Sequence, residues 1–203
     1  WMERMNPEQV TLCRIQDGGV LSGNKPSSEV GFHAGILRAR PEMNVVLHFQ
    51  TPCATALACR RPDGLDYAVI PEIPYYIGSI GRVPYFTPGT DELSAAVTEA
   101  MRANDMVLMA NHGQVTAGRD YDQVVQNAEF FELACQILLI GGDSVAPMPA
   151  EAAAQLRALI RGALRRHREI QMAAGAAVEQ RAGQAIGAEG GIVRMSVGRR
   201  HGP

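Results

Sequence analysis

The stretch NKPSSEVGFHAGILRARPEMNVVLHFQ, residues 24–50, decides the fold because a helix leads directly into a strand within it. A proline and two serines give a rigid entry with side-chain oxygens suited to capping, and apolar residues then recur at helical spacing over residues 29–40. A second proline breaks this helix, and the apolar run at 45–47 predicts a short buried strand. Glu29 therefore opens a helix and His48 closes a strand. These are the two kinds of terminus at which α/β proteins build sites.

The rest of the chain continues this alternation. Further strands are predicted at 10–15, 67–70, 106–110 and 115–117, and further helices at 52–59, 90–103, 120–140 and 151–166. The turn-rich residues 16–23 are expected to connect two elements, and prolines make 70–76 an edge or irregular segment. The pattern indicates an α/β protein.

Length and composition favour a single globular domain with a substantial core. The 203 residues are 46% hydrophobic with a net charge of -2, which gives no signal for binding nucleic acid or an anionic membrane. We expect the domain to cover 1–166 and an Ala-, Gly- and Arg-rich tail to cover 167–203. Four cysteines without disulfide-type spacing, and no recognisable signal peptide or membrane span, make a cytoplasmic location the default expectation.

Two of the predicted strands end at or beside a histidine. His48 follows the run at 45–47, and His112 lies at a sharp bend after the strand at 106–110. Together with Glu29 they offer two imidazoles and a carboxylate, which suit a catalytic zinc with an open coordination position. Triplets of this kind also arise by chance, and histidines with purely structural partners are the commoner explanation, so both alternatives stay open on residue type alone.

Several motifs occur in the order found in the class II aldolase/adducin family. They are PSSE at 26–29, RPxxNVVxH at 40–48, PGTxEL at 88–93 and NHG at 111–113. Over about residues 1–165 the sequence resembles this family, and within it the members that cleave L-fuculose 1-phosphate. The resemblance implies a three-layer α/β/α sandwich with a largely antiparallel central sheet, assembled as a homotetramer with active sites at subunit interfaces. It also implies an N-terminally incomplete chain, because a phosphate-binding segment of the family would precede Trp1.

The resemblance further implies roles for individual residues around the metal. Glu29 would be the general acid/base and could also contact the metal, and His48 and His112 would bind Zn2+. Gln50 stands where the family more often has the second histidine of an H-x-H pair, and its amide oxygen is a weaker zinc ligand than imidazole. Gln50 is therefore either a metal ligand, with another divalent metal in place of zinc an option, or a surface residue. His33 shares a helix face with Glu29 but is expected to pack or to orient it.

Two further sets of residues match substrate-binding and catalytic positions of the family. Ser27 and Ser28 match residues that hold the substrate phosphate, although ordinary helix capping would also place serines here. Tyr75 falls near a tyrosine that donates a proton across the subunit boundary. Its neighbour Tyr76 is the alternative, and either ring could instead serve only in packing.

These matches predict metal-dependent aldol cleavage of a ketose 1-phosphate to dihydroxyacetone phosphate and an aldehyde, through a zinc-stabilised enediolate. The only lysine, Lys25, lies in a turn before a proline, which argues against a Schiff-base route. The alternatives are sugar-phosphate 4-epimerisation or dehydration at the same metal, and a metal-free, adducin-like interaction module. The expected partner is a small sugar phosphate, with no role for nucleic acid or membrane.

Overall fold

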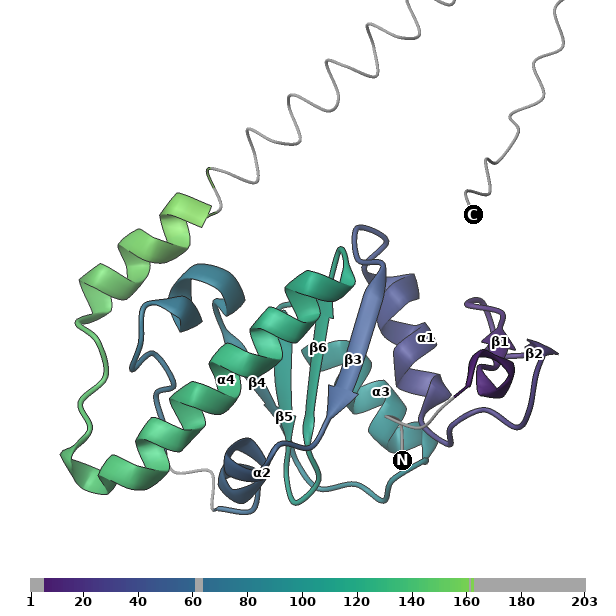
Figure 1. Cartoon of the computed structure of the whole chain (residues 1–203), viewed down its shortest axis with the longest axis horizontal. Helices are drawn as coiled ribbons and strands as arrows, with labels where there is room; N and C mark the ends of the chain where they lie inside the picture. Colours follow the sequence, from purple (N-terminus) through teal and green to yellow (C-terminus); the bar gives the residue numbers. More distant parts are fainter. Residues whose placement is uncertain (1–5, 61–63, 161, 163–203) are drawn as a thin grey trace, which may run out of the picture. The chain divides into compact units, whose positions relative to one another are not determined.

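The computed structural model describes residues 6–60, 64–160 and 162, and these residues contain a four-stranded sheet with helices on both faces. The strand order is β3 (Val45–Phe49), β6 (Gln114–Gly118), β5 (Met106–Met109) and β4 (Ile80–Val83). Helices α1 (Val30–Ala39) and α3 (Asp91–Ala100) cover one face, and α2 (Pro52–Ala58) and α4 (Tyr121–Gly141) cover the other (Figure 1). The predicted α/β class is confirmed.

The sheet is mixed, so the expectation of a largely antiparallel sheet is wrong. β6 pairs antiparallel with both β3 and β5, but β4 runs parallel to β5, with Ile80 opposite Met106. The chain passes through α3 between β4 and β5, and a crossover helix of this kind returns the chain to the same end of a sheet. β4 was not predicted because Gly81 and Arg82 interrupt a run of only four residues.

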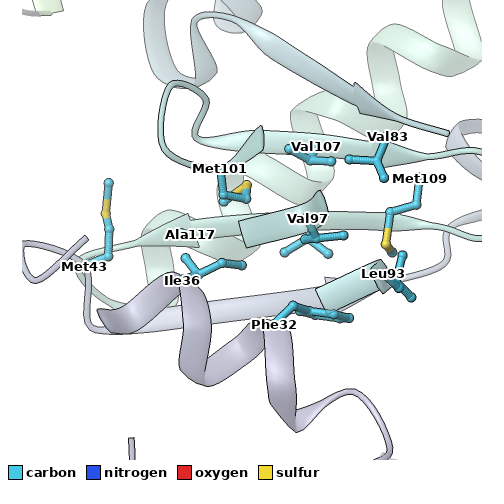
Figure 2. Close-up of a cluster of buried hydrophobic side chains, with 11 residues drawn as sticks. Phe32, Ile36, Met43, Val83, Leu93, Val97, Met101, Val107, Met109 and Ala117 are labelled. Atoms are coloured by element: carbon cyan, nitrogen blue, oxygen red, sulfur yellow. The ribbon is translucent and has the colours of Figure 1, made fainter. Parts of the chain in front are cut away.

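Residues of the central strand β5 alternate between the two hydrophobic cores. Val107 and Met109 of β5 face α1 and α3, where Phe32 and Ile36 of α1 pack against the same cluster (Figure 2). Met106 and Leu108 of the same strand face α2 and α4. Alternation with period two explains why all four residues of β5 are buried, and why the strand is apolar throughout.

Small residues bring α1 close to α3. A Cβ atom at Gly31 would lie 2.5 Å from the Ser94 hydroxyl oxygen, and one at Gly35 would overlap the side chain of Thr98. Only glycine permits this approach at both positions. The contact fixes α1 against the core, and with it Glu29, which precedes the first residue of the helix.

The predicted helices α1 to α4 lie where the sequence placed them, within a few residues. In the described part of the chain, α4 is the one helix long and apolar enough to cross a membrane, but six of its residues are buried inside the protein. It is a core helix that packs against β6, β3 and α2. The last predicted helix is seen at 150–160 and 162, whereas its end and the predicted tail at 167–203 lie outside the described residues.

Three local predictions need correction. The strand at 10–15 is reduced to β1 (Leu12–Cys13), and its antiparallel partner β2 (Val20–Ser22) lies in the segment predicted to be a connection. The strand at 67–70 is wrong, because the Asp66 carboxylate accepts the Ala68 N–H at 2.9 Å and turns the chain. The proline-rich segment after it forms a π-helical turn, Ile73–Ile77.

Candidate metal centre

Glu29, His48 and His112 come from three separate segments and meet at one place. Glu29 is the N-cap residue of α1, His48 is the next-to-last residue of β3, and His112 lies in the turn that joins β5 to β6. Antiparallel pairing of β3 with β6 places His48 opposite Val115, close to this turn. One potential ligand atom from each side chain lies within 4.8 Å of the others. Three of the four residues predicted to bind a metal, Glu29, His48 and His112, are therefore neighbours in space.

The Glu29 carboxylate faces both imidazoles. Its Oε2 lies 3.3 Å from Nε2 of His48, and its Oε1 lies 3.3 Å from Nε2 of His112. The two contacts use different carboxylate oxygens, and the three side chains are close enough together for one divalent cation to contact all of them. The Glu29 side chain is buried, and its Oε1 has no hydrogen-bond partner. A buried carboxylate oxygen without a donor, beside two ring nitrogens, fits a bound divalent cation.

His48 is oriented by a main-chain group of the neighbouring strand. Its Nδ1 lies 2.9 Å from the carbonyl oxygen of Gln114, which can only accept a hydrogen bond. With the proton on Nδ1, the lone pair of Nε2 faces Glu29 and is free to bind a cation. The Phe32 ring supports the imidazole in an edge-on contact at 5.8 Å between centroids. The sequence could not predict this contact of Gln114, because every residue has a main-chain carbonyl and the residue type gives no indication of its partner.

His112 is held by a tight turn in a partly buried environment. The preceding Asn111 adopts a left-handed φ of 54°, and the His112 N–H donates to the Met109 carbonyl at 3.2 Å. Burial lowers the pKa of His112, with a further lowering from His48, while Glu29 acts in the opposite direction. The net effect favours the neutral imidazole, the form that binds metals. Its Nδ1 is buried without a hydrogen-bond partner.

Gln50 lies at the rim of this centre. Its side-chain Nε2 donates to the main-chain carbonyl of His112 at 2.7 Å. This contact connects the residue after β3 to the turn that carries His112. The contact uses the amide nitrogen and does not test whether the amide oxygen of Gln50 binds a metal. Metal binding by Gln50 therefore stays a prediction.

His33 lies next to the centre but outside the group of ligand atoms. Burial lowers its pKa to about 4, the nearby His48 contributes to the lowering, and a hydrogen bond with the Val46 carbonyl opposes it. The ring stacks on Phe32 with 4.8 Å between centroids. These contacts are packing contacts. They agree with the sequence analysis, which favoured packing over metal binding for His33.

The predicted phosphate residues lie at the start of α1, beside the centre. The Ser27 hydroxyl oxygen accepts the main-chain N–H of Glu29 at 3.2 Å, and both Ser27 and Ser28 are exposed to solvent. Ser28 also packs closely on Gly89: a Cβ atom added at Gly89 would lie 2.9 Å from the Cβ of Ser28. This bond closes a local turn just before α1 and is not a helix cap, because the N-cap residue is Glu29 and no side chain caps it. The phosphate role stays a prediction.

Tyr75 lies in the π-helical turn, whose Ile73 and Ile77 pack in the core beneath α2 and α4. Its ring contacts Tyr76 at 4.7 Å between centroids, and Tyr76 in turn stacks on Phe130 of α4 at 5.4 Å. Within the residues that the structure describes, no contact joins Tyr75 to the Glu29 centre. A catalytic role across a subunit boundary therefore remains a prediction for this residue.

Comparison with known proteins identifies the family. Residues 1–139 match the Class II Aldolase and Adducin N-terminal domain, so the chain belongs to the class II aldolase/adducin family. This confirms the resemblance that the four motifs indicated.

Three individual proteins are similar to this chain. The 3-oxo-tetronate 4-phosphate decarboxylase of Escherichia coli (strain K12) is 34% identical over 142 residues, which cover 68% of this chain and 66% of that protein. The L-fuculose phosphate aldolase of Methanococcus maripaludis (strain C5) is 29% identical over 133 residues, 66% of this chain and 70% of that protein. The crystal structure of YgbL from Escherichia coli matches with a TM-score of 0.70 and 31% identity over 76% of each chain. At 66%, the chain spans slightly less than two thirds of the decarboxylase.

Proposed function

We propose that this protein cleaves the bond between the α- and β-carbons of a carbonyl group in a small phosphorylated substrate, in a reaction that depends on a divalent metal. The observation that carries the proposal is the Glu29 carboxylate, buried between His48 and His112 with one oxygen lacking any donor. A cation held by these three residues would supply Lewis-acid stabilisation to the adjacent oxygens of an enediolate.

The first substrate to test is 3-oxo-tetronate 4-phosphate, which the 34% identical Escherichia coli enzyme decarboxylates according to its name. In this compound the carboxylate is attached to C2, next to the C3 carbonyl. When the C1–C2 bond breaks, carbon dioxide leaves and the electron pair of the bond stays on C2 as an enediolate. Addition of one proton to C2 then gives dihydroxyacetone phosphate.

Aldol cleavage of a ketose 1-phosphate is the second candidate, and the similarity to L-fuculose phosphate aldolase supports it. Breaking the C3–C4 bond of L-fuculose 1-phosphate releases an aldehyde and leaves the same three-carbon enediolate. Both reactions thus make one demand on the site, which is to stabilise this enediolate and to deliver a proton to carbon. The two candidates differ only in the group that leaves.

Glu29 is the residue in position to move this proton. A carboxyl group at the edge of a metal centre can deliver a proton to carbon in the cleavage direction and remove it in reverse. His48 and His112 hold the cation, and the Gln114 carbonyl keeps the His48 ring in the orientation that binding requires. Ser27 and Ser28, at the exposed start of α1, are proposed to bind the substrate phosphate through their hydroxyls and the nearby N–H groups.

The assembly and location of the protein belong to the same proposal. A homotetramer would let Tyr75 of one subunit act at the centre of its neighbour. The π-helical turn is mostly buried, but Tyr76 beside Tyr75 is 39% exposed, which supports a contact with a neighbouring subunit there. All four cysteines are free thiols, which supports a reducing compartment such as the cytoplasm.

The deciding experiment supplies purified protein and a divalent metal with each substrate in turn. Formation of dihydroxyacetone phosphate reports cleavage, and carbon dioxide or an aldehyde as the second product identifies the reaction. The His112→Ala variant, prepared in parallel, gives the background rate. If metal-loaded protein releases dihydroxyacetone phosphate from neither substrate, the proposal is wrong. If it also binds no metal, the adducin-like module becomes the better explanation.

A further inference from the structure

The side chain of Gln50 lies beside the metal centre. It is the residue directly after β3 and follows His48 by two positions. A Cβ atom at Gly113 would lie 2.7 Å from Cγ of Gln50 and 3.2 Å from Cε1 of His48. The two side chains therefore converge over Gly113, which adjoins the third ligand, His112.

The amide nitrogen of Gln50 already has a defined partner. It donates to the His112 carbonyl at 2.7 Å, and because a carbonyl oxygen only accepts, this contact fixes which end of the amide is nitrogen. The bond ties the end of β3 to the β5–β6 turn. These are the two segments that supply both imidazoles, so Gln50 holds His112 in position relative to His48 through the main chain.

The chemistry of the ligand set follows from this arrangement. The described residues offer one carboxylate and two imidazoles, and Gln50 adds at most a neutral amide oxygen to them. Imidazole favours zinc and other later transition metals, whereas carboxylate, carbonyl and water oxygens suit manganese and magnesium. An imidazole at position 50 would add to the preference for zinc, and an amide does not.

We propose that Gln50 sets the metal preference of this centre by keeping an imidazole out of position 50, so that Zn2+ gains no further ligand of the kind it prefers over Mn2+, while its amide holds the His112 turn in place. This inference rests on the metal centre of the proposed function but on neither candidate substrate. Its test is therefore a binding measurement that needs no turnover.

Affinities for Zn2+ and for Mn2+ are measured by competition with a chelating dye, on metal-free wild-type protein and on Gln50→His and Gln50→Ala. Gln50→His is expected to bind Zn2+ at least ~10-fold more tightly, with a change of less than about threefold for Mn2+. Gln50→Ala is expected to weaken both metals by a similar factor, on the order of 10-fold, because it frees the His112 turn without changing the ligand atoms. Gln136→His adds an imidazole on the exposed side of α4 and should change neither affinity.

The outcomes separate this inference from the proposed function. If wild-type protein binds metal but the ratio of zinc to manganese affinity is unchanged in Gln50→His, the inference is overturned and the centre stands. If Gln50→Ala loses Mn2+ much more than Zn2+, the amide oxygen is itself a ligand and the positioning role is overturned. If wild-type protein binds neither metal, both the inference and the proposed function are wrong.

Discussion

Oε2 of Glu29 lies 3.3 Å from Nε2 of His48, although one residue precedes a helix and the other ends a strand. The two come together because α1 leads directly into β3 and packs against it, so the start of the helix returns to the end of the strand. His112 joins this pair only when β6 pairs with β3.

Removal of either imidazole is expected to abolish tight binding of a divalent metal, because a site with three protein ligands seldom tolerates the loss of one. His48→Ala and His112→Ala are compared with wild type by measuring the metal bound to purified protein. His33→Ala is the matched control, since it removes a neighbouring imidazole that lies outside the ligand group. Full metal occupancy in His48→Ala or His112→Ala would contradict the assignment of the centre.

The sequence predicted the ligand residues because local patterns mark where elements begin and end. The proline and serines at 26–28 predict the start of α1, and the β-branched run at 45–47 predicts β3. Asn111 predicts the bend before His112. Asn is among the few residues that readily adopt the left-handed conformation found there, with φ 54°. The element ends that carry Glu29, His48 and His112 were therefore predictable, whereas the distances between these side chains depended on tertiary contacts. Their role as metal ligands stays a prediction.

Features set by tertiary contacts could not be predicted. β4 exists because the edge of β5 offers partners to a short run, and Arg82 is accommodated because it donates to the Ala58 and Arg60 carbonyls at the end of α2. The role of Gln50 at the His112 carbonyl depends equally on a contact 62 residues away in the chain. The local sequence pattern predicts neither the pairing of β4 nor the contact of Gln50 with the His112 carbonyl.

Gly113→Ala is expected to weaken metal binding and to destabilise the fold by about 1–3 kcal/mol, because the new methyl group would overlap Gln50 and approach the His48 ring. Thermal unfolding and a Zn2+ titration measure the two effects. Gly118→Ala is the control, since its new methyl group would crowd Val124 by a comparable amount at the far end of β6, away from the ligands. The control should lose stability and keep its metal affinity. Equal metal affinity in both variants would show that Gly113 has no special role.

Glu132 of α4 stabilises the start of α2. Its two carboxylate oxygens accept the N–H groups of Cys53 and Ala54, each at 2.8 Å. Glu132→Ala is therefore expected to lower the free energy of unfolding by about 1–3 kcal/mol, as loss of a helix cap does. Chemical denaturation at pH 7 measures this change. Glu129→Ala, on the exposed side of the same helix, is the control and should cost less than about 0.5 kcal/mol.

The same contact predicts a pH dependence. Burial by itself would raise the pKa of Glu132, but the N–H groups of Cys53 and Ala54 outweigh it and lower the pKa below its ordinary value of 4.5. A lowered pKa in the folded state means that ionised Glu132 stabilises the protein above this ordinary value, and that the stabilisation is lost as the pH falls through the folded-state pKa. The stability difference between wild type and Glu132→Gln should therefore be constant near pH 7 and shrink below about pH 4.5. A difference that grows on acidification would contradict this account.

Glu29→Gln separates the catalytic role of this residue from its structural one. An acid at the start of a helix contributes only ~0.3–1 kcal/mol through the helix dipole, and here its side chain makes no capping hydrogen bond. Loss of a positioned general acid or base costs ~10²–10⁴ in rate, or about 3–5 kcal/mol of barrier. The variant keeps the shape of the side chain and one oxygen that can face the metal. We therefore expect a stable protein that binds the metal more weakly, because an amide oxygen replaces the carboxylate, and that forms dihydroxyacetone phosphate at least ~100-fold more slowly once the metal is loaded.

The comparison uses wild type and Glu29→Gln with identical chain ends, assayed on whichever substrate the wild type cleaves. Melting temperature and bound metal are measured on the same preparations, so that a slow variant is not mistaken for an unfolded or metal-free one. A third protein, Glu29→Asp, keeps the acid but shortens its reach by one methylene, and it should recover part of the rate because a misplaced base is better than none. If Glu29→Gln turns over within a few-fold of wild type while its metal is retained, Glu29 serves only the metal and the start of α1, and another group must move the proton.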